Sequence, residues 1–189
     1  MVQLKDITII ESGTSQFRIN EAQGEDAPIR FFYGQAELEA DLTSLASSID
    51  PKQIRTNDEV STLKDGDLVF SLISGKSTIV KPWHEGYVFT QNYVRIVPAP
   101  LIDSCFLAYL LNENEEIKRQ LAIGQQGSIT LKYTVKQLSS LQIPNLPPIK
   151  RQKIIGDLYF RQLKLAALEK RLADSETKLV LQRLKEACD

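Results

Sequence analysis

The chain has 189 residues, of which 42% are hydrophobic, with two cysteines and a formal net charge of −1. No apolar run approaches the roughly 18 residues that a membrane-spanning helix needs, and two cysteines far apart in sequence exclude a disulfide framework and favour the cytoplasm. The near-neutral charge argues against a protein that binds DNA unaided, because such proteins usually carry a large basic surplus.

Charge is spread unevenly along the chain. Residues 1–60 hold 5 Lys/Arg against 11 Asp/Glu, a net of −6, whereas residues 149–189 hold 10 against 6, a net of +4. If the chain binds DNA, we therefore expect other subunits to supply much of the contact with the phosphates.

The first third of the chain predicts short strands, a loop and one helix. Residues 2–10 are typical of a strand or short helix, the polar residues 11–28 of a loop, and residues 29–34 of a strand. Residues 35–50 predict an amphipathic helix that ends before Pro51. Its apolar stripe would consist of Leu38, Leu42 and Leu45.

The middle of the chain predicts three strands and a strong helix. The strands are residues 68–73, 77–82 and 87–98, the last enriched in β-branched and aromatic residues. Residues 102–124 predict one helix, which Asp103 can cap and Gly124 can close. After a short helix or turn leading into a further strand, residues 1–143 are thus expected to form an α+β head.

A proline-rich segment follows the head. Pro144, Pro147 and Pro148 prevent a helix from running through residues 144–148, because proline fixes φ and forces the preceding residue into an extended conformation. The segment predicts a stiff hinge. Residues 149–189 then predict one long helix, of which residues 149–187 would span about 58 Å at 1.5 Å per residue.

The long helix carries a heptad pattern of leucines. A stripe of this length needs a partner, and we expect a second helix to cover it. A helix folded back onto its own head is the alternative. The seam is imperfect, because Arg161, Ser175 and Gln182 occupy companion positions. The expected dimer interface consists of Ile154, Leu158, Leu165, Leu168, Leu172 and Leu179.

Two short motifs resemble parts of catalytic sites but do not match those sites in full. Residues 75–78 (GKST) end like a phosphate-binding loop, but Phe70 stands where that loop needs glycine. Glu116 and Lys118, with Asp103 upstream, resemble a nuclease set, but they lie on a predicted helix and fit a solvated charged face better.

Two further candidates, one for a methyltransferase site and one for a metal or catalytic histidine, do not match such sites either. Residues 145–148 (NLPP) do not have the order of an amino-methyltransferase motif, and no glycine-rich site for the methyl donor is present. His84 is the only histidine, lies far from both cysteines in sequence, and is expected on a surface turn. The sequence therefore predicts a binding protein without catalytic residues, metal or cofactor.

Polar side chains in the predicted loops and strand ends are candidates for DNA contact. Amide side chains can pair with adenine edges and arginine with guanine, whereas lysine and hydroxyl groups can contact phosphates. Ordinary loop polarity is the alternative for each of them. The candidates are Lys76, Ser77, Thr78, Gln91, Asn92, Arg95, Gln125, Gln126, Ser128 and Lys132.

Several segments, in order, resemble those of a known family. They are VQLKDITIIESG (2–13), LKDGDLVFSLISG (63–75), FTQNYVRIVP (89–98), FLAYLLN (106–112) and GSITLKYTVKQLSSLQIPNLPPIKRQKIIGDL (127–158). With these segments, nearly the whole chain resembles one half of a type I restriction-modification specificity subunit. The last segment is the most specific, because a Leu-x-x-Leu-x-Ile-Pro run leads through prolines to Gln152 and a long helix.

This resemblance implies a target recognition domain followed by a spacer helix. Full-length members carry two such units with antiparallel spacer helices, and the two heads read the two halves of a split double-stranded DNA site. The subunit is non-catalytic and directs methyltransferase subunits, which use S-adenosylmethionine, with or without a restriction subunit. A single unit implies a homodimer and a palindromic site. The resemblance does not transfer base-reading residues.

Two other functions stay open at this point. The first is a coiled-coil interaction or regulatory protein that binds restriction-modification subunits without reading DNA. The second is an isolated enzyme, which the missing catalytic set argues against.

Overall fold

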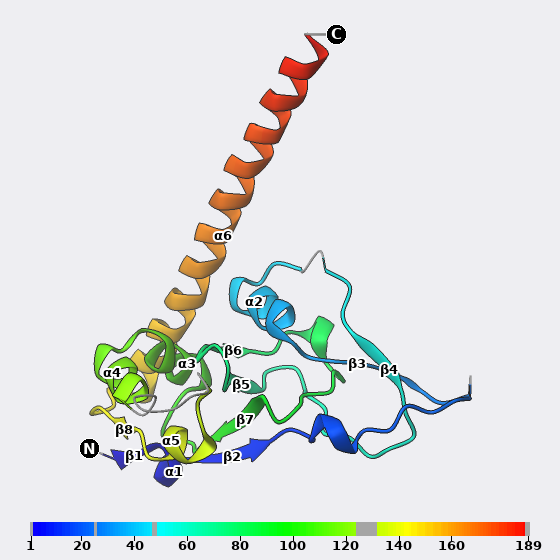
Figure 1. The fold of residues 1–189 in the computed structure, drawn as a ribbon. Coiled ribbons are helices and arrows are strands. Elements are labelled where there is room, and N and C mark those ends of the chain that lie inside the picture. The colour runs from blue at the N-terminus through cyan, green and yellow to red at the C-terminus, as the bar shows by residue number, and fades with distance from the viewer. Residues whose placement is uncertain (1, 25, 47–48, 124–131, 188–189) are drawn as a thin grey trace.

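A four-stranded antiparallel sheet lies at the centre of the head in the computed structural model (Figure 1), which describes residues 2–24, 26–46, 49–123 and 132–187. All three neighbouring pairs in the sheet are antiparallel. In spatial order the strands are β2 (Thr8–Ser12), β7 (Tyr93–Pro98), β5 (Leu68–Ser71) and β6 (Ser77–Ile79).

Two small ribbons complete the strands. β1 (Val2–Gln3) pairs with β8 (Gln142–Ile143), which places the first residues of the chain beside the start of the proline-rich segment. β3 (Ile29–Phe31) pairs with β4 (Gln53–Arg55) away from the central sheet. The short helices α1 (Leu4–Ile7) and α5 (Val135–Ser139) lie near the first ribbon.

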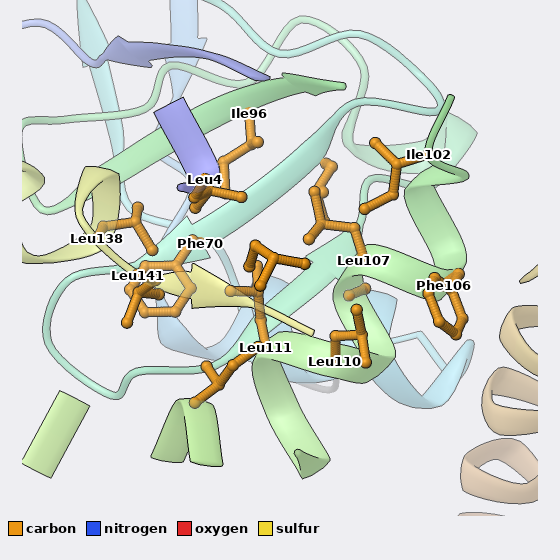
Figure 2. Close-up of a cluster of buried hydrophobic side chains, with 14 of the residues drawn as sticks. Leu4, Phe70, Ile96, Ile102, Phe106, Leu107, Leu110, Leu111, Leu138 and Leu141 are labelled. Carbon is orange, nitrogen blue, oxygen red and sulfur yellow. The ribbon is translucent and has the colours of Figure 1, made fainter. Parts of the chain in front are cut away.

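The main core lies between the central sheet and helix α3 (Ser104–Glu113). In Figure 2, Leu107 and Leu111 of this helix point toward Phe70 of β5, and all three side chains are fully buried. Every residue of β5 is buried, which explains its continuous apolar pattern. Helix α2 (Gln35–Thr43) packs against β6 of the sheet, and helix α4 (Glu115–Ile123) packs against α3.

Helix α6 (Ile149–Glu186) begins against the head and then extends away from it (Figure 1). Its first turns pack on α3 and α2, whereas the C-terminal end lies far from the head. Within the described residues, no helix has the length and apolar character needed to cross a membrane. The predicted α+β class followed by a long C-terminal helix is confirmed.

Several predicted elements are shorter than the sequence pattern suggested, and three of them differ most. The predicted helix over residues 102–124 is two helices, because Asn114 is extended and its Oδ1 accepts a hydrogen bond from the backbone of Ile117 at 3.1 Å. The predicted strand over 87–98 begins only at Tyr93, after a turn closed by its bond to the carbonyl of Thr90 at 2.9 Å. The helix predicted over 35–50 ends at Thr43.

The expectation that His84 lies on a surface turn is wrong. Its ring is buried, and Nδ1 lies 2.8 Å from Oδ1 of the fully buried Asp41. Tyr33 donates a hydrogen bond to the other oxygen of Asp41 at 2.9 Å, and burial followed by the Asp41 charge raises the pKa of Tyr33 well above its ordinary value. The histidine is therefore part of the packing under α2, where a buried carboxylate needs such partners.

Candidate nucleic-acid interface and helix face

The turn before β7 brings together candidates from distant parts of the sequence. Gln91 is exposed, and the side chain of Asn92 accepts a hydrogen bond from Nζ of Lys132 at 2.7 Å. The Asn92 carbonyl accepts from the backbone of Leu72 at 2.8 Å, which fixes the turn on the sheet. Two residues predicted independently for DNA contact therefore lie side by side.

A second loop lies against this turn. The backbone of Gln91 donates to the carbonyl of Thr14 at 3.1 Å, and the backbone of Thr14 donates to the carbonyl of Phe89 at 3.1 Å. Gly13 is required for this approach, because a Cβ there would lie 2.3 Å from the Phe89 oxygen. Four residues after Gly13, Phe17 is 91% exposed.

The loop is held in place by bonds on both sides of Phe17. Thr14 Oγ1 accepts from the backbone of Ser61 at 2.8 Å, the side chain of Ile19 is buried, and Asp58 accepts from the backbone of Asn20 at 2.7 Å. The exposed aromatic ring therefore stands on an anchored turn, where its exposure has no packing explanation.

We call these side chains the turn surface: Phe17, Arg18, Gln91, Asn92 and Lys132. An exposed aromatic ring can stack on bases or enter a base step, and the polar members match base edges and phosphates. The sequence-based reasoning missed Phe17 and Arg18 because it treated residues 11–28 as an ordinary polar loop. An aromatic residue followed by arginine inside a polar loop was the available signal.

Two of the predicted DNA contacts are wrong. Ser77 and Thr78 are fully buried, and the Ser77 hydroxyl donates to the carbonyl of Ala108 at 3.2 Å. They belong to β6, which is covered by α3, and therefore cannot touch a duplex. Lys76 is half-exposed, with Nζ 3.7 Å from a carboxylate oxygen of Glu39.

The side chain of Arg95 is already paired with carboxylates of neighbouring residues. Its Nε donates to Glu11 at 2.7 Å, and its Nη1 lies 3.3 Å from Asp67. The hydrogen bond to Glu11 and the nearby carboxylates raise the pKa of Arg95. The expected base contact by Arg95 stays a prediction, and Gln125, Gln126 and Ser128 lie outside the described residues.

The start of α6 is built into the head. Gln152 is buried, and its side chain makes three hydrogen bonds to backbone groups that precede α3 and α6. One turn later, Gly156 lies against Cys105 and Phe106 of α3, and Phe160 is buried in the main core. These contacts fix the direction in which α6 leaves the head. The boundaries of the predicted domains stay a prediction.

The predicted leucine stripe lies on the opposite side of α6. At 3.6 residues per turn, its members point about 160° away from the side that holds Gly156 and Leu163. The alternative of a stripe folded back onto the head is therefore wrong. The stripe is exposed in this chain, by 43% to 67%, at Ile154, Leu158, Leu165, Leu168, Leu172 and Leu179.

The sequence matches the model of the type I restriction modification DNA specificity domain over residues 1–175. The chain belongs to this family. The match includes the turn surface, the joint between α3 and α6, and all but the last member of the leucine stripe. A comparison with curated proteins finds no match for this specificity domain.

Solved structures share the fold of the specificity domain. The crystal structure of an HsdS subunit from Thermoanaerobacter tengcongensis is similar with a TM-score of 0.60 at 20% identity, and the match covers 98% of this chain and 42% of that one. A structure described for complex assembly and conformational transition of the type I R-M system has a TM-score of 0.64 at 23% identity, covering 98% and 43%.

A third structure is more distant. The type I restriction-modification S subunit from M. genitalium has a TM-score of 0.52 at 14% identity, and the match covers 96% of this chain and 42% of that one. The specificity domain thus spans less than half the length of each of these solved chains.

The described part of the specificity domain offers little for metal or thiol chemistry. Within those residues, no three His, Cys, Asp or Glu side chains form a group that could hold a metal ion. Cys105 lies half-buried beside α6, and its burial raises the pKa of the thiol, which lowers its reactivity at neutral pH.

Proposed function

We propose that this chain is a sequence-reading DNA-binding unit of a type I restriction-modification system and has no chemistry of its own. The family match over residues 1–175 carries this proposal, and the exposed Phe17, Arg18 and Gln91 of the turn surface support it. The unit would direct methyltransferase subunits that use S-adenosylmethionine, with or without a restriction subunit. Its place of action would be the cytoplasm.

The charge of the chain suggests how affinity and specificity would be divided. The net charge of −1 supplies little attraction for phosphates. Methyltransferase subunits that enclose the duplex would provide most of that attraction. The turn surface would then contribute base contacts, which select the sequence.

The leucine stripe supports a spacer role for α6. We propose that a second long helix packs on it in the antiparallel direction, so that two heads lie at opposite ends and read the two halves of a split site. If that helix belonged to a second copy of this chain, the site would be a palindrome. The distance between the half-sites would follow from the length of the helix pair.

Gel-shift experiments test the proposal directly. The chain is mixed with a library of duplexes, with and without the methyltransferase subunits of the same system, at a stated salt concentration. We expect selection of a specific sequence in the presence of those subunits. If neither format shows sequence-dependent binding, the proposal fails, and the regulatory coiled-coil function becomes the better explanation.

The turn surface gives the first prediction. Replacing Phe17 and Arg18 with alanine should weaken binding to the selected duplex by about tenfold or more, because stacking and an arginine contact are each worth about 1–3 kcal/mol. The matched control replaces Leu181 and Lys170, an exposed apolar and an exposed basic residue of α6 that lie outside the leucine stripe. Equal affinity of both variants would exclude the turn surface from the interface.

The leucine stripe gives the second prediction. Replacing Leu165 and Leu172 with glutamate should abolish the self-association that we expect of the wild-type chain at high concentration, because two charges would enter the apolar seam. Both side chains are exposed, so the head should stay folded. The control places glutamate at Ala166 and Ala173, which are exposed beside the stripe. Sedimentation velocity would contradict the prediction if association survived at the leucine positions.

A further inference from the structure

Two columns of charged side chains run along the edges of the leucine stripe. The basic column lies one residue before Leu165, Leu172 and Leu179 and continues one heptad further, and it consists of Lys164, Arg171, Lys178 and Lys185. The acidic column lies on the other edge and consists of Glu169 and Glu176, although Arg183 follows them one heptad later on the same edge. All six side chains are exposed, and none takes part in an ion pair within the described residues.

These columns occupy the positions that decide which helix can pair with α6. Residues beside a leucine seam meet the partner helix and set its identity and direction. In an antiparallel pair of identical helices, each edge meets the same edge of the other copy, because the two-fold axis exchanges them. Basic side chains of the first edge would then face basic side chains, whereas the second edge gives a smaller conflict because Arg183 follows Glu169 and Glu176 on it.

The conflict does not depend on the exact alignment of the two helices. The basic column covers residues 164–185 without an acidic member, so antiparallel copies that overlap within this range always bring like charges together. Asp157, at the head end of the same edge, is the exception, and it can meet only the far end of a second copy. It cannot compensate the like-charge contacts in the middle of the pair.

We propose that the partner of α6 is a non-identical antiparallel helix with a leucine stripe and complementary edges. It carries acidic side chains opposite Lys164, Arg171 and Lys178, and basic side chains opposite Glu169 and Glu176. This inference rests on the antiparallel arrangement of the proposed function and specifies its partner. It favours a different helix over the second copy of this chain that a homodimer would require.

The effect is large enough to select a partner. Exchanging a like-charge contact for an opposite-charge contact at three positions should tighten a helix pair by about tenfold to a hundredfold. The five leucines of the leucine stripe still attract any apolar helix, so a second copy should bind, but more weakly.

A charge-reversed copy of the chain provides the probe. It carries Lys164→Glu, Arg171→Glu and Lys178→Glu, which exchange one good helix former for another. We expect the mixture of wild-type and reversed chains to form 1:1 pairs about tenfold to a hundredfold more tightly than either chain alone, by sedimentation equilibrium without DNA. Raising the ionic strength should weaken the mixed pair and strengthen the self-pairs, because salt screens both attraction and repulsion.

Two further variants control the experiment. Reversal of three exposed lysines on the head gives the same change in net charge and should leave pairing with the wild type unchanged; these are Lys5, Lys64 and Lys136. A chain with Glu169→Lys and Glu176→Lys should also pair with the wild type more tightly than the wild type pairs with itself. This second route keeps the test decisive if the first variant folds poorly.

Three results would overturn the proposal. A wild-type self-pair tighter than the mixed pair would indicate parallel helices, in which the basic column meets the acidic one. Equal or undetectable pairing in all mixtures would show that the edges do not select the partner. Unchanged pairing with a loss of DNA affinity would assign the basic column to DNA. Because pairing is measured without DNA, failure of DNA recognition would appear separately, in the gel shifts.

Discussion

Replacing Gly156 with alanine is expected to destabilise the protein by about 2 kcal/mol, although alanine is the better helix former. The new Cβ would lie 2.6 Å from Cβ of Cys105, 2.7 Å from the backbone nitrogen of Phe106 and 2.8 Å from the carbonyl carbon of Cys105. Two of these atoms are backbone, so rotation of a side chain cannot relieve the clash. Overpacking of about 3 kcal/mol outweighs the gain of about 1 kcal/mol in helix propensity.

The control lies on the same helix. Ser175 is exposed on α6, and its replacement by alanine should leave stability unchanged or raise it by a few tenths of a kcal/mol. Urea unfolding followed by circular dichroism measures both variants. Adding Cys105→Gly to Gly156→Ala should restore only part of the loss, because the backbone contacts persist. A stabilised Gly156→Ala variant would show that α6 does not pack this closely on α3.

The contrast between the two sides of α6 shows what the sequence could predict. The leucine stripe was predictable because one residue type recurs every seven positions. The side that holds the head was not, because it combines an amide at Gln152, a glycine at Gly156 and aromatic residues. These residues share a role, which is close contact with α3 and the residues before it. A repeating hydrophobic pattern does not indicate such a contact.

The candidate DNA interface likewise contains some residues that the sequence could predict and others that it could not. Asn92 and Lys132 were selected for their chemistry, and the fold places them together. Ser77 and Thr78 were selected on the same grounds but lie in a buried strand, where the Ser77 hydroxyl is satisfied by α3. Polarity alone does not indicate burial, because a buried hydroxyl needs only a nearby carbonyl. Phe17 was missed for the converse reason, since an apolar side chain is expected inside.

Replacing Gln152 tests the other half of the joint between α6 and the head. Its Nε2 donates to the carbonyl of Pro147 at 2.8 Å and to that of Leu101 at 3.1 Å, and its Oε1 accepts from the backbone of Asp103 at 2.9 Å. Alanine would leave three backbone groups without partners at a site where the side chain is 1% exposed. We expect a loss of about 2–5 kcal/mol, because each unsatisfied buried group costs about 1–3 kcal/mol when water cannot replace its partner fully.

Glutamate at the same position separates hydrogen bonding from shape. Gln152→Glu keeps the volume, but a carboxylate cannot donate to the two carbonyls and would be buried next to them, so its folded-state pKa should lie above the unfolded value of about 4.3. The protonated form fits the folded state better. The penalty relative to wild type should therefore be smallest below about pH 4 and grow as pH rises through the folded pKa.

Chemical denaturation of wild type and variant across this range measures the difference. Gln162→Glu, at an exposed position of α6, serves as the matched control and should show almost no dependence on pH. A pH-independent penalty for Gln152→Glu would mean that water reaches this side chain. The direction of α6 would then depend on Gly156 and Phe160 rather than on the amide, so packing alone would set the angle between the head and α6.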